Sequence, residues 1–186
     1  MNHGQRDEIA GLAREVIEAA SACGIRCCVG GSVASSIHGV VRATADIDFV
    51  MLIDAAGARS LVELLSDRMH GDPDAAAACI ASGRAFNLID LSTMLKVDVF
   101  PAHDWFSVAV IDRAVLVAHV PIASAEDVIL AKLRWFREGG CSSDRQWQDV
   151  LGVLRSVGAG LDRRYLASTA DRLSLGDLLA KAIDAA

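Results

Sequence analysis

The sequence predicts an α/β protein of the α+β type, with a mixed sheet, helices packed against that sheet, and a helical lobe at the C-terminal end. In the first part of the chain, segments with helical spacing of apolar residues alternate with short apolar runs of strand length. From Ser124 onward the spacing is helical throughout. Because every strand and helix must bury its apolar side against another element, this alternation favours a sheet covered by helices. We expect an α/β core over residues 1–122 and a helical lobe over residues 123–186.

The expected core starts with a helix in which Ile9, Leu12 and Val16 recur every three or four positions. Glycines end the first strand and the second helix, and a polar Ser92-Thr93 turn joins two later strands. In order, the core elements expected are a helix at 5–23, a strand at 26–29, a helix at 32–38, a strand at 47–53, a helix at 54–70, a helical piece at 74–81, strands at 85–90 and 95–100, and a strand at 114–120.

The expected lobe starts at Ser124, which is followed three residues later by Asp127, a spacing typical of a capped helix start. Ser143 and Gln146 have the same spacing and predict the start of the next helix. The helices expected in the lobe cover residues 124–137, 143–157, 162–172 and 175–185.

Composition and charge restrict the class of protein. The 186 residues are 53% hydrophobic, which excludes a disordered chain. The net charge of −6 argues against a broad nucleic-acid-binding face, because such a face would be basic. A local basic patch that holds an RNA end stays open, and solvated helix faces are the other explanation of the same charges. The candidate residues are Lys132, Arg134, Arg137, Arg163 and Arg164.

The N-terminal charges and the cysteines indicate the compartment. Charged residues from Arg6 to Glu18 interrupt the apolar run that a signal peptide needs, and no apolar run reaches membrane-spanning length. The five cysteines form no CxxC pair, so we expect free thiols in a reducing compartment and no zinc site. We therefore expect a soluble, cytoplasmic protein with no membrane partner.

Three aspartates on two expected strands are the candidate catalytic and metal-binding residues. Asp46 and Asp48 lie two positions apart, so their side chains share one face of the strand. Asp98 lies on a later strand and joins them if the two strands are neighbours. Clustered carboxylates repel one another unless a cation intervenes, and oxygen ligands without His or Cys select Mg²⁺ or Mn²⁺. A solvated strand edge is the alternative explanation of the Asp46–Asp48 pair.

The turn Gly30-Gly31-Ser32 lies where a strand is expected to give way to a helix. Backbone N–H groups and the positive end of the helix dipole meet at such a turn, and glycine lets a phosphate approach the backbone. A plain tight turn with Ser32 as the helix N-cap is the other explanation. Combined with metal ions, which activate a hydroxyl and stabilise a leaving pyrophosphate, the turn favours nucleotide transfer, with Asp98 able to accept the proton.

The order of these motifs resembles the polymerase-β-like nucleotidyltransferase superfamily. Its signature is a Gly-Gly or Gly-Ser turn, an Asp-x-Asp strand and a third Asp on a later strand. The closer resemblance is to the AbiEii-like bacterial nucleotidyltransferase group, and it spans nearly the whole chain. The residues that match are Gly31-Ser32 and the stretch that follows to Gly39, Arg42-x-Thr44-x-Asp46-Ile47-Asp48, Asp98, Glu126-Asp127 with Lys132-Leu133, and in part Arg145-Gln146-Trp147-Gln148-Asp149.

This resemblance implies a mixed, mostly antiparallel sheet of the nucleotidyltransferase type, with flanking helices and a C-terminal helical lobe. Asp46, Asp48 and Asp98 would be catalytic and would bind Mg²⁺ or Mn²⁺. Gln146 stands where many members have an acid, which argues against a second proton-handling group there. The residues that the resemblance assigns to nucleotide binding are Gly30, Gly31, Ser32, Arg42, Thr44 and Lys132.

We expect a metal-dependent nucleotidyltransferase that moves a nucleoside monophosphate from an NTP to a hydroxyl. A toxin-like role is one form that this activity could take. The acceptor hydroxyl would belong to an RNA end, a protein side chain or a small molecule. The alternative is a catalytically silent module that binds a nucleotide or a partner within a toxin–antitoxin or regulatory pair. An antitoxin-like protein is the candidate protein partner.

Overall fold

The structure, a computed structural model, describes residues 3–186 and forms two compact units. The α/β unit contains the described residues up to Gly30 together with Ala43–Ala123. The helical unit contains Gly31–Arg42 and Ser124–Ala186. The sequence placed residues 31–42 in the core, whereas here they group with the helical unit. Two separate domains at 1–122 and 123–186 stay a prediction.

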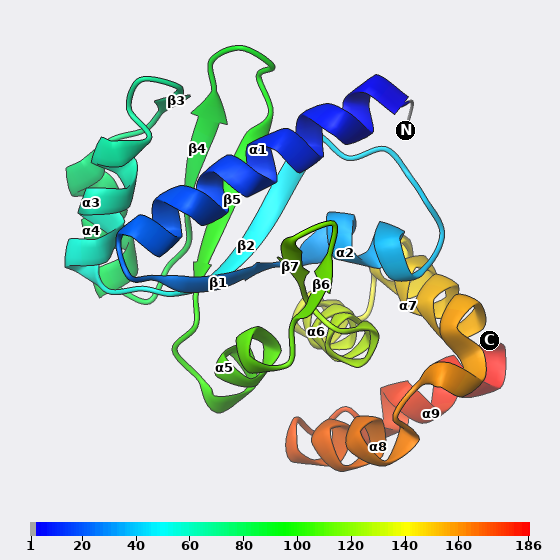
Figure 1. Cartoon of the computed structure of the whole chain (residues 1–186). Coiled ribbons are helices and arrows are strands. Elements are labelled where there is room, and N and C mark those ends of the chain that lie inside the picture. Colours follow the sequence, from blue (N-terminus) through cyan, green and yellow to red (C-terminus); the bar gives the residue numbers. More distant parts are fainter. Residues whose placement is uncertain (1–2) are drawn as a thin grey trace. The chain divides into compact units, whose positions relative to one another are not determined.

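Within residues 3–186, the strands of the α/β unit form one seven-stranded sheet in the order β3-β4-β5-β2-β1-β7-β6 (Figure 1). The β2–β5 and β1–β7 pairs are parallel, and the other four pairs are antiparallel. The predicted mixed, mostly antiparallel sheet is therefore confirmed. The strands are β1 (Arg26–Val29), β2 (Asp46–Leu52), β3 (Met69–His70), β4 (Phe86–Asp90), β5 (Lys96–Pro101), β6 (Val115–Val117) and β7 (Val120–Ile122).

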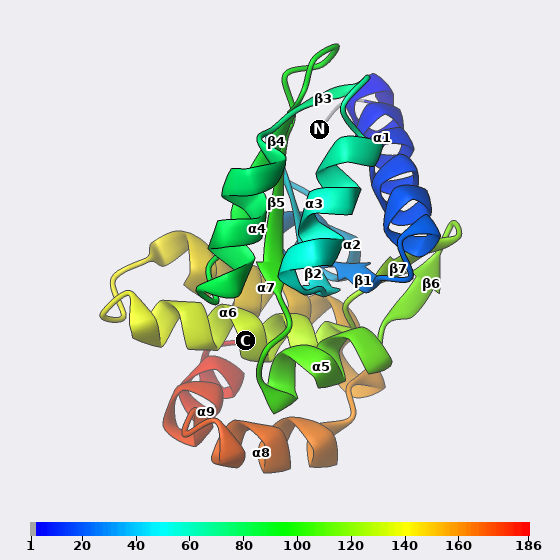
Figure 2. The ribbon, with the colours of Figure 1, turned by 90° about the vertical axis from the view of Figure 1, so that its left-hand side faces the viewer.

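Four helices of the described chain pack in the α/β unit, and Figure 2 shows two of them, α3 and α4, side by side. Aspartates begin both: the Asp54 carboxylate accepts from the Gly57 N–H at 2.7 Å, and Asp72 caps α4 with Pro73 at its first position. The two carboxylates stabilise the helix starts because they accept from N–H groups that have no partner within the helix, and Pro73 has no N–H that would need one. The helices are α1 (His3–Ala22), α3 (Ala55–Leu64), α4 (Pro73–Ala81) and α5 (Trp105–Asp112).

The helical unit packs α2 and α7 closely through glycine. A Cβ placed on Gly39, just after α2, would lie 2.9 Å from Ser35 O and 2.9 Å from Val153 N of α7. Ser124 and Ser143 cap α6 and α7 as predicted, by accepting from the N–H groups of Asp127 and Gln146. The elements of this unit are α2 (Gly31–His38), α6 (Ala125–Glu138), α7 (Asp144–Val157), a 3₁₀ turn (Gly158–Gly160), α8 (Arg163–Arg172) and α9 (Gly176–Ala185).

Two expected elements of the core are wrong in part. The single strand at 114–120 is a hairpin of β6 and β7, which turns at Ala118 and His119, both with positive φ. Residues other than glycine rarely adopt such angles, so the sequence did not predict a turn there. The helix at 54–70 ends at Leu64, and Met69–His70 forms the short edge strand β3 instead.

Helix α5 was not expected, although its start has a clear signal. Asp104 and Ser107 form a capping box, in which the Asp104 carboxylate accepts from the Ser107 N–H at 2.7 Å. The helix is apolar on several sides, so it shows no helical periodicity. The Cys28 thiol donates to the carbonyl of Val110 at 3.8 Å and ties α5 to β1.

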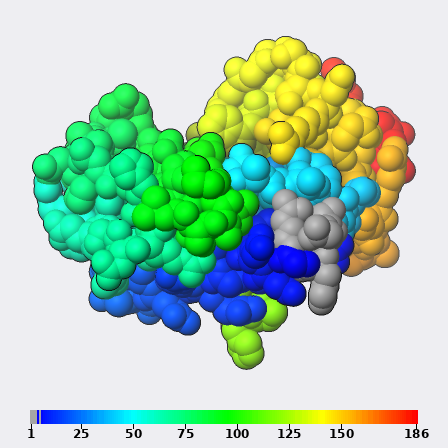
Figure 3. All heavy atoms as spheres, turned by 90° about the horizontal axis from the view of Figure 1, so that it is seen from above, coloured from blue at the N-terminus to red at the C-terminus, as the bar shows by residue number. Residues whose placement is uncertain are grey.

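The turn that joins β4 to β5 (green in Figure 3) lies at the surface, yet it is built around a fully buried aspartate. Asp90 accepts from the Thr93 N–H at 3.0 Å, from Ser92 Oγ at 2.9 Å and from the Arg68 guanidinium at 2.9 Å. Burial alone would raise the pKa of Asp90, but these hydrogen bonds outweigh it and lower the pKa to about 2.

Among residues 3–186, no helix is long and apolar enough to span a bilayer.

Candidate functional site

The carboxylates of the α/β unit lie on β2 and β5, which are neighbours in a parallel pair. Asp48 is the direct partner of Asp98, and Asp46 is the direct partner of Lys96. Directly paired residues point to the same face of a sheet. The three aspartates and Lys96 therefore share one face, and the condition set in the sequence analysis, that the two strands are neighbours, is met.

The opposite face of this strand pair holds the register. Ile47 and Phe49 of β2, and Val97 and Val99 of β5, are all fully buried. A shift of one residue would turn these apolar side chains outward and the aspartates inward, which costs several kcal/mol at about 2 kcal/mol per exposed side chain. Core burial thus positions the carboxylates, each of which is half-buried.

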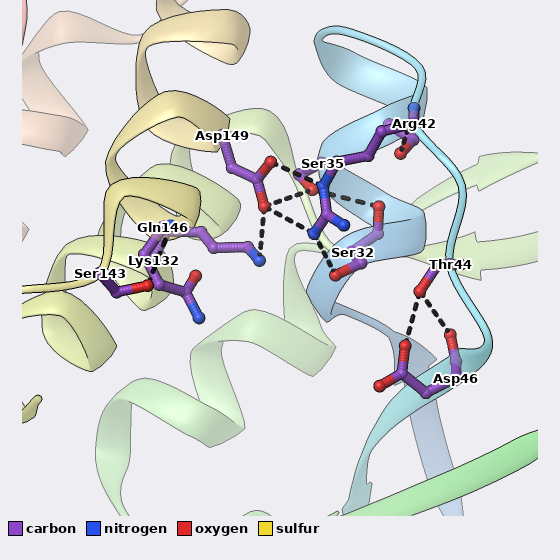
Figure 4. Close-up of polar contacts among 10 residues, drawn as sticks. Ser32, Ser35, Arg42, Thr44, Asp46, Lys132, Ser143, Gln146 and Asp149 are labelled. Carbon is purple, nitrogen blue, oxygen red and sulfur yellow. Dashed lines mark hydrogen bonds and ion pairs between the residues drawn. The ribbon is translucent and has the colours of Figure 1, made fainter.

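Backbone and hydroxyl groups position Asp46 and Asp48. The Thr44 hydroxyl donates to Oδ1 of Asp46 at 2.6 Å (Figure 4). The Gly30 N–H donates to the carbonyl of Asp48 at 2.8 Å, which continues the antiparallel β1–β2 pairing by one residue. The sequence assigned Gly30 and Thr44 to nucleotide binding; in the structure Gly30 N–H is used in the sheet and Thr44 orients Asp46.

A lysine is the cation of this face. Lys96 Nζ lies 2.7 Å from Oδ2 of Asp98. The hydrogen bond to Asp98 raises the pKa of Lys96 despite the opposing effect of desolvation, and the charges of Asp46 and Asp48 raise it further. The ammonium is therefore close enough to interact with all three carboxylates, a relation that the sequence analysis did not consider.

The donor chemistry of this face fits a divalent metal ion, but the ligand set is not assembled. Mg²⁺ and Mn²⁺ prefer carboxylate oxygens, which Asp46, Asp48 and Asp98 supply. Among the described residues, no group of three or more His, Cys, Asp and Glu side chains is arranged to hold an ion. The Asp98 carboxylate instead binds Lys96. Metal binding would require these side chains to move.

In the helical unit, an aspartate that the sequence analysis did not single out joins two of the predicted nucleotide-binding residues (Figure 4). Asp149 of α7 lies 2.9 Å from Lys132 Nζ of α6 and 3.0 Å from Arg42 Nε. The Lys132 and Asp149 side chains are 7% and 8% exposed. Arg42 also donates to the Ser32 hydroxyl of α2 at 2.6 Å. The helical unit thus brings Ser32, Arg42 and Lys132 together around Asp149.

The ion pairs of Asp149 outweigh its burial. Desolvation would raise the pKa of this carboxyl, but hydrogen bonds from Arg42 and Lys132 and their positive charges lower it. Two cations therefore surround one carboxylate, and the Lys132 and Asp149 side chains have little exposure to water. The partial match of 145–149 to the AbiEii-like group had contained Asp149, but without a role.

Acidic residues at the start of α6 are structural. Asp127 accepts from the Ser124 hydroxyl at 2.7 Å and from the Tyr165 hydroxyl at 2.6 Å, and Glu126 accepts from the Asp162 N–H at 2.8 Å. These bonds attach α8 to α6. Within the Glu126-Asp127…Lys132-Leu133 motif, the acids therefore support the fold, and Lys132 is the residue that reaches Asp149.

The Gly-Gly-Ser turn differs in detail from its prediction. Gly31 begins α2 with φ of 53°, a left-handed value that glycine adopts without strain. Ser32 lies inside the helix and is buried, so it is not the N-cap. Gln146 stands where many members of the AbiEii-like group have an acid. Its Oε1 is buried and has no hydrogen-bond partner within residues 3–186.

The sequence matches no family model, and no curated protein matches it either. Several solved structures are similar in fold, among them the following three. The antibiotic-resistance factor ANT(2'')-Ia, in solution, is 15% identical with a TM-score of 0.55, over 94% of this chain and 98% of that one. An antigenic nucleotidyltransferase-like protein from Paracoccidioides brasiliensis is 15% identical with a TM-score of 0.55, over 96% and 93%. A crystal structure of ANT(2'')-Ia in complex with adenylyl-2''-tobramycin is 16% identical with a TM-score of 0.50, over 87% and 97%.

These similarities define the class of fold. The chain has the nucleotidyltransferase fold, with the mixed sheet and flanking helices that the motifs predicted. At this level of identity the shared fold does not assign a substrate. The activity, the acceptor and the site residues must be argued from this chain's own side chains.

Proposed function

We propose that this chain is a metal-dependent nucleotidyltransferase that moves a nucleoside monophosphate from an NTP to a hydroxyl acceptor. One observation carries the proposal. Asp46, Asp48 and Asp98 share one face of adjacent parallel strands, with Asp48 directly beside Asp98, in a chain with the nucleotidyltransferase fold. Three carboxylates are costly to cluster, so their placement favours a role in binding a cation.

The roles follow from the positions of the side chains. Asp46 and Asp48 would hold Mg²⁺ or Mn²⁺, and Asp98 would complete the ligand set and accept the proton of the attacking hydroxyl. When bound, these ions supply charge neutralisation and activation of that hydroxyl. A bond forms between the acceptor oxygen and the α-phosphorus, the bond from that phosphorus to the bridging oxygen breaks, and pyrophosphate leaves with the electron pair.

The helical unit offers groups for the phosphates. Arg42 and Lys132 carry two positive charges against the single negative charge of Asp149. We assign the triphosphate contacts to these two cations and to the hydroxyl of Ser32. The start of α2 at Gly31 would add backbone N–H groups. Contacts from Gly30 and Thr44 stay predictions.

We favour a small molecule as the acceptor. The net charge of −6 opposes binding of a polyanion such as RNA, although a local basic patch would permit it. The neighbour ANT(2'')-Ia has been solved with an adenylylated small molecule, adenylyl-2''-tobramycin. An RNA end or a protein side chain is the other acceptor class to test.

A catalytically silent binding module is the second candidate function. The ion pair between Lys96 and Asp98 favours it, because Asp98 Oδ2 cannot bind a metal ion while the Lys96 ammonium lies against it. In that case the chain would bind a nucleotide or a protein without turnover, as in a toxin–antitoxin or regulatory pair. Membership of the AbiEii-like group, an antitoxin-like protein partner and a cytoplasmic location are proposed for this chain under either candidate function.

Calorimetric binding of ATP, GTP, CTP and UTP, each with and without Mg²⁺, tests the proposal. The variants are Asp48→Asn and, as a matched control, Asp67→Asn, an exposed residue of the same unit. We expect one NTP to bind only with metal, and Asp48→Asn alone to abolish this. Radiolabel transfer from that NTP to aminoglycosides or to tRNA then separates the acceptor classes. Metal-independent binding without transfer would favour a silent module that binds a nucleotide. No binding of any NTP would overturn the enzyme and favour a silent module that binds a protein partner.

A further inference from the structure

Lys96 lies on the same face of the sheet as the three carboxylates. Its Cα partner across the parallel pair is Asp46, and its ammonium lies 2.7 Å from Oδ2 of Asp98, the partner of Asp48. The side chains of Lys96 and Asp98 are 41% and 15% exposed. The lysine therefore reaches from the solvent side onto a carboxylate that is largely shielded.

The three carboxylates need a counter-charge when no metal is bound. Like charges on directly paired residues destabilise a strand pair. An opposite charge within about 4 Å offsets that repulsion by roughly 1 to 4 kcal/mol, depending on exposure. Lys96 supplies this charge from within the same face. It does so by using an oxygen of Asp98 that a metal ion would also need.

The two uses of Asp98 exclude one another. An ammonium and a divalent ion cannot both lie against Asp98 Oδ2 without repulsion at close range. Lysine has a flexible stem of four carbons and a compact charge, so it can swing into water while its backbone stays in the strand. A divalent ion could use Asp98 Oδ2 only after the Lys96 ammonium has left that oxygen.

We propose that Lys96 is the resident counter-ion of the carboxylate face, and that a divalent ion binds only by displacing its ammonium from Asp98. Lys96 thereby sets the affinity of the face for metal: it stabilises the metal-free protein and weakens metal binding. This inference rests on the proposed function, because it assumes that the three aspartates are the metal ligands. Lys96 is a positioning residue and does not itself touch the reacting atoms.

The test is the dissociation constant of Mn²⁺, measured by the electron paramagnetic resonance signal of free Mn²⁺ without any nucleotide. We expect Lys96→Met to bind Mn²⁺ about 5- to 20-fold more tightly than the wild type, since a competing charge is removed. Lys181→Met, which removes an exposed lysine from α9, should bind like the wild type. Equal or weaker binding by Lys96→Met would overturn the inference, as would a failure of both proteins to bind.

Thermal unfolding in the presence of a chelator provides a readout without metal. Lys96→Met should lower the melting temperature, and the double variant Lys96→Met/Asp98→Asn should recover it, because one repelling charge is gone. A loss that the double variant does not recover would indicate lost packing and contradict a counter-ion role. Asp48→Asn separates the two hypotheses: Mn²⁺ binding that this variant removes supports the metal site whatever Lys96→Met does. Tighter Mn²⁺ binding without NTP binding would support the Lys96 inference and contradict the proposed enzyme.

Discussion

Asp48 of β2 and Asp98 of β5 are direct partners in a parallel strand pair, so two distant parts of the sequence place their carboxylates side by side. The apolar residues on either side of each aspartate, Ile47 and Phe49 on β2 and Val97 and Val99 on β5, are fully buried, and this burial fixes the register. The buried face of the strand pair therefore determines where the carboxylates lie. The repulsion among the carboxylates is tolerated because burial of the opposite face stabilises the strand pair.

The first prediction concerns metal-dependent stability. Added Mg²⁺ or Mn²⁺ should raise the melting temperature of the wild type. At a metal concentration a hundred times the dissociation constant, the free energy of unfolding should rise by about 2.7 kcal/mol. Asp48→Asn should lose this gain because it removes a ligand. Scanning calorimetry of both proteins, with Asp67→Asn as the control, measures it. An equal gain in Asp48→Asn would show that metal stabilises some other part of the chain.

The second prediction concerns Asp149. Asp149→Asn keeps the shape of the side chain but removes the negative charge next to Lys132 and Arg42, which are 7% and 25% exposed. Breaking a shielded ion pair from one side is strongly destabilising, so we expect a loss of about 2–4 kcal/mol in urea unfolding. Asp184→Asn, an exposed change in α9, should stay within about 0.5 kcal/mol.

The loss of stability in Asp149→Asn should depend on pH, and the pKa of Asp149 gives the direction of that dependence. Its pKa is lowered in the folded protein, so its contribution is present at neutral pH and is lost as the pH falls through the folded pKa. Asp149→Asn should therefore cost most near pH 7 and least in acid. A cost that does not change with pH would mean that the carboxylate acts through its shape and not through its charge.

How much of this site the sequence could predict depends on how far each contact reaches along the chain. The alternation of Asp46 and Asp48 with buried residues is local, and it placed both side chains on one face correctly. The β2–β5 pairing is set by packing of the whole sheet, so it could be stated only as a condition. Lys96 lies two residues before Asp98, so its place beside Asp98 is local. That it also lies beside Asp46 depends on the β2–β5 pairing, in which Asp46 is its direct partner.

The fold shows the same limit. The capped starts at Ser124 and Ser143 are local signals, and both were confirmed. The turn between β6 and β7 has left-handed residues that are not glycine or asparagine, so the sequence contained no turn signal. Asp149 was within a noted motif, but its contacts with Arg42 of another segment depend on the packing of α2 against α7.

The third prediction concerns the β4–β5 turn in acid. The pKa of Asp90 is lowered to about 2 in the folded protein. The unfolded carboxyl binds its proton first, so the stabilisation is complete above about pH 4 and is lost as the pH falls toward about 2. Urea unfolding from pH 6 to pH 2.5 should show a loss of at most about 2 kcal/mol from this group, less where water screens Arg68. In Asp90→Asn that part of the slope should be absent, and an unchanged slope would assign the loss to other carboxyls.

The fourth prediction uses two glycines. In Gly39→Ala the new methyl would lie 2.9 Å from Ser35 O, 2.9 Å from Val153 N and 3.0 Å from the carbonyl carbon of Gly152. All three are backbone atoms, so α2 and α7 must move apart to make room. We expect a loss of about 1–3 kcal/mol in urea unfolding, the usual cost of overpacking.

Gly11→Ala is the matched control for that substitution. Gly11 lies in the middle of α1, and a Cβ there would have no neighbouring atom within 4 Å. Alanine is favoured over glycine inside a helix, so this variant should gain about 0.5–1 kcal/mol. Because the same chemical change has opposite expected signs at the two sites, helix propensity and close packing are separated by one pair of measurements. A gain at Gly39 as well would mean that α2 and α7 pack less closely than 2.9 Å contacts require, and the position of Arg42 beside Asp149 would then need another explanation.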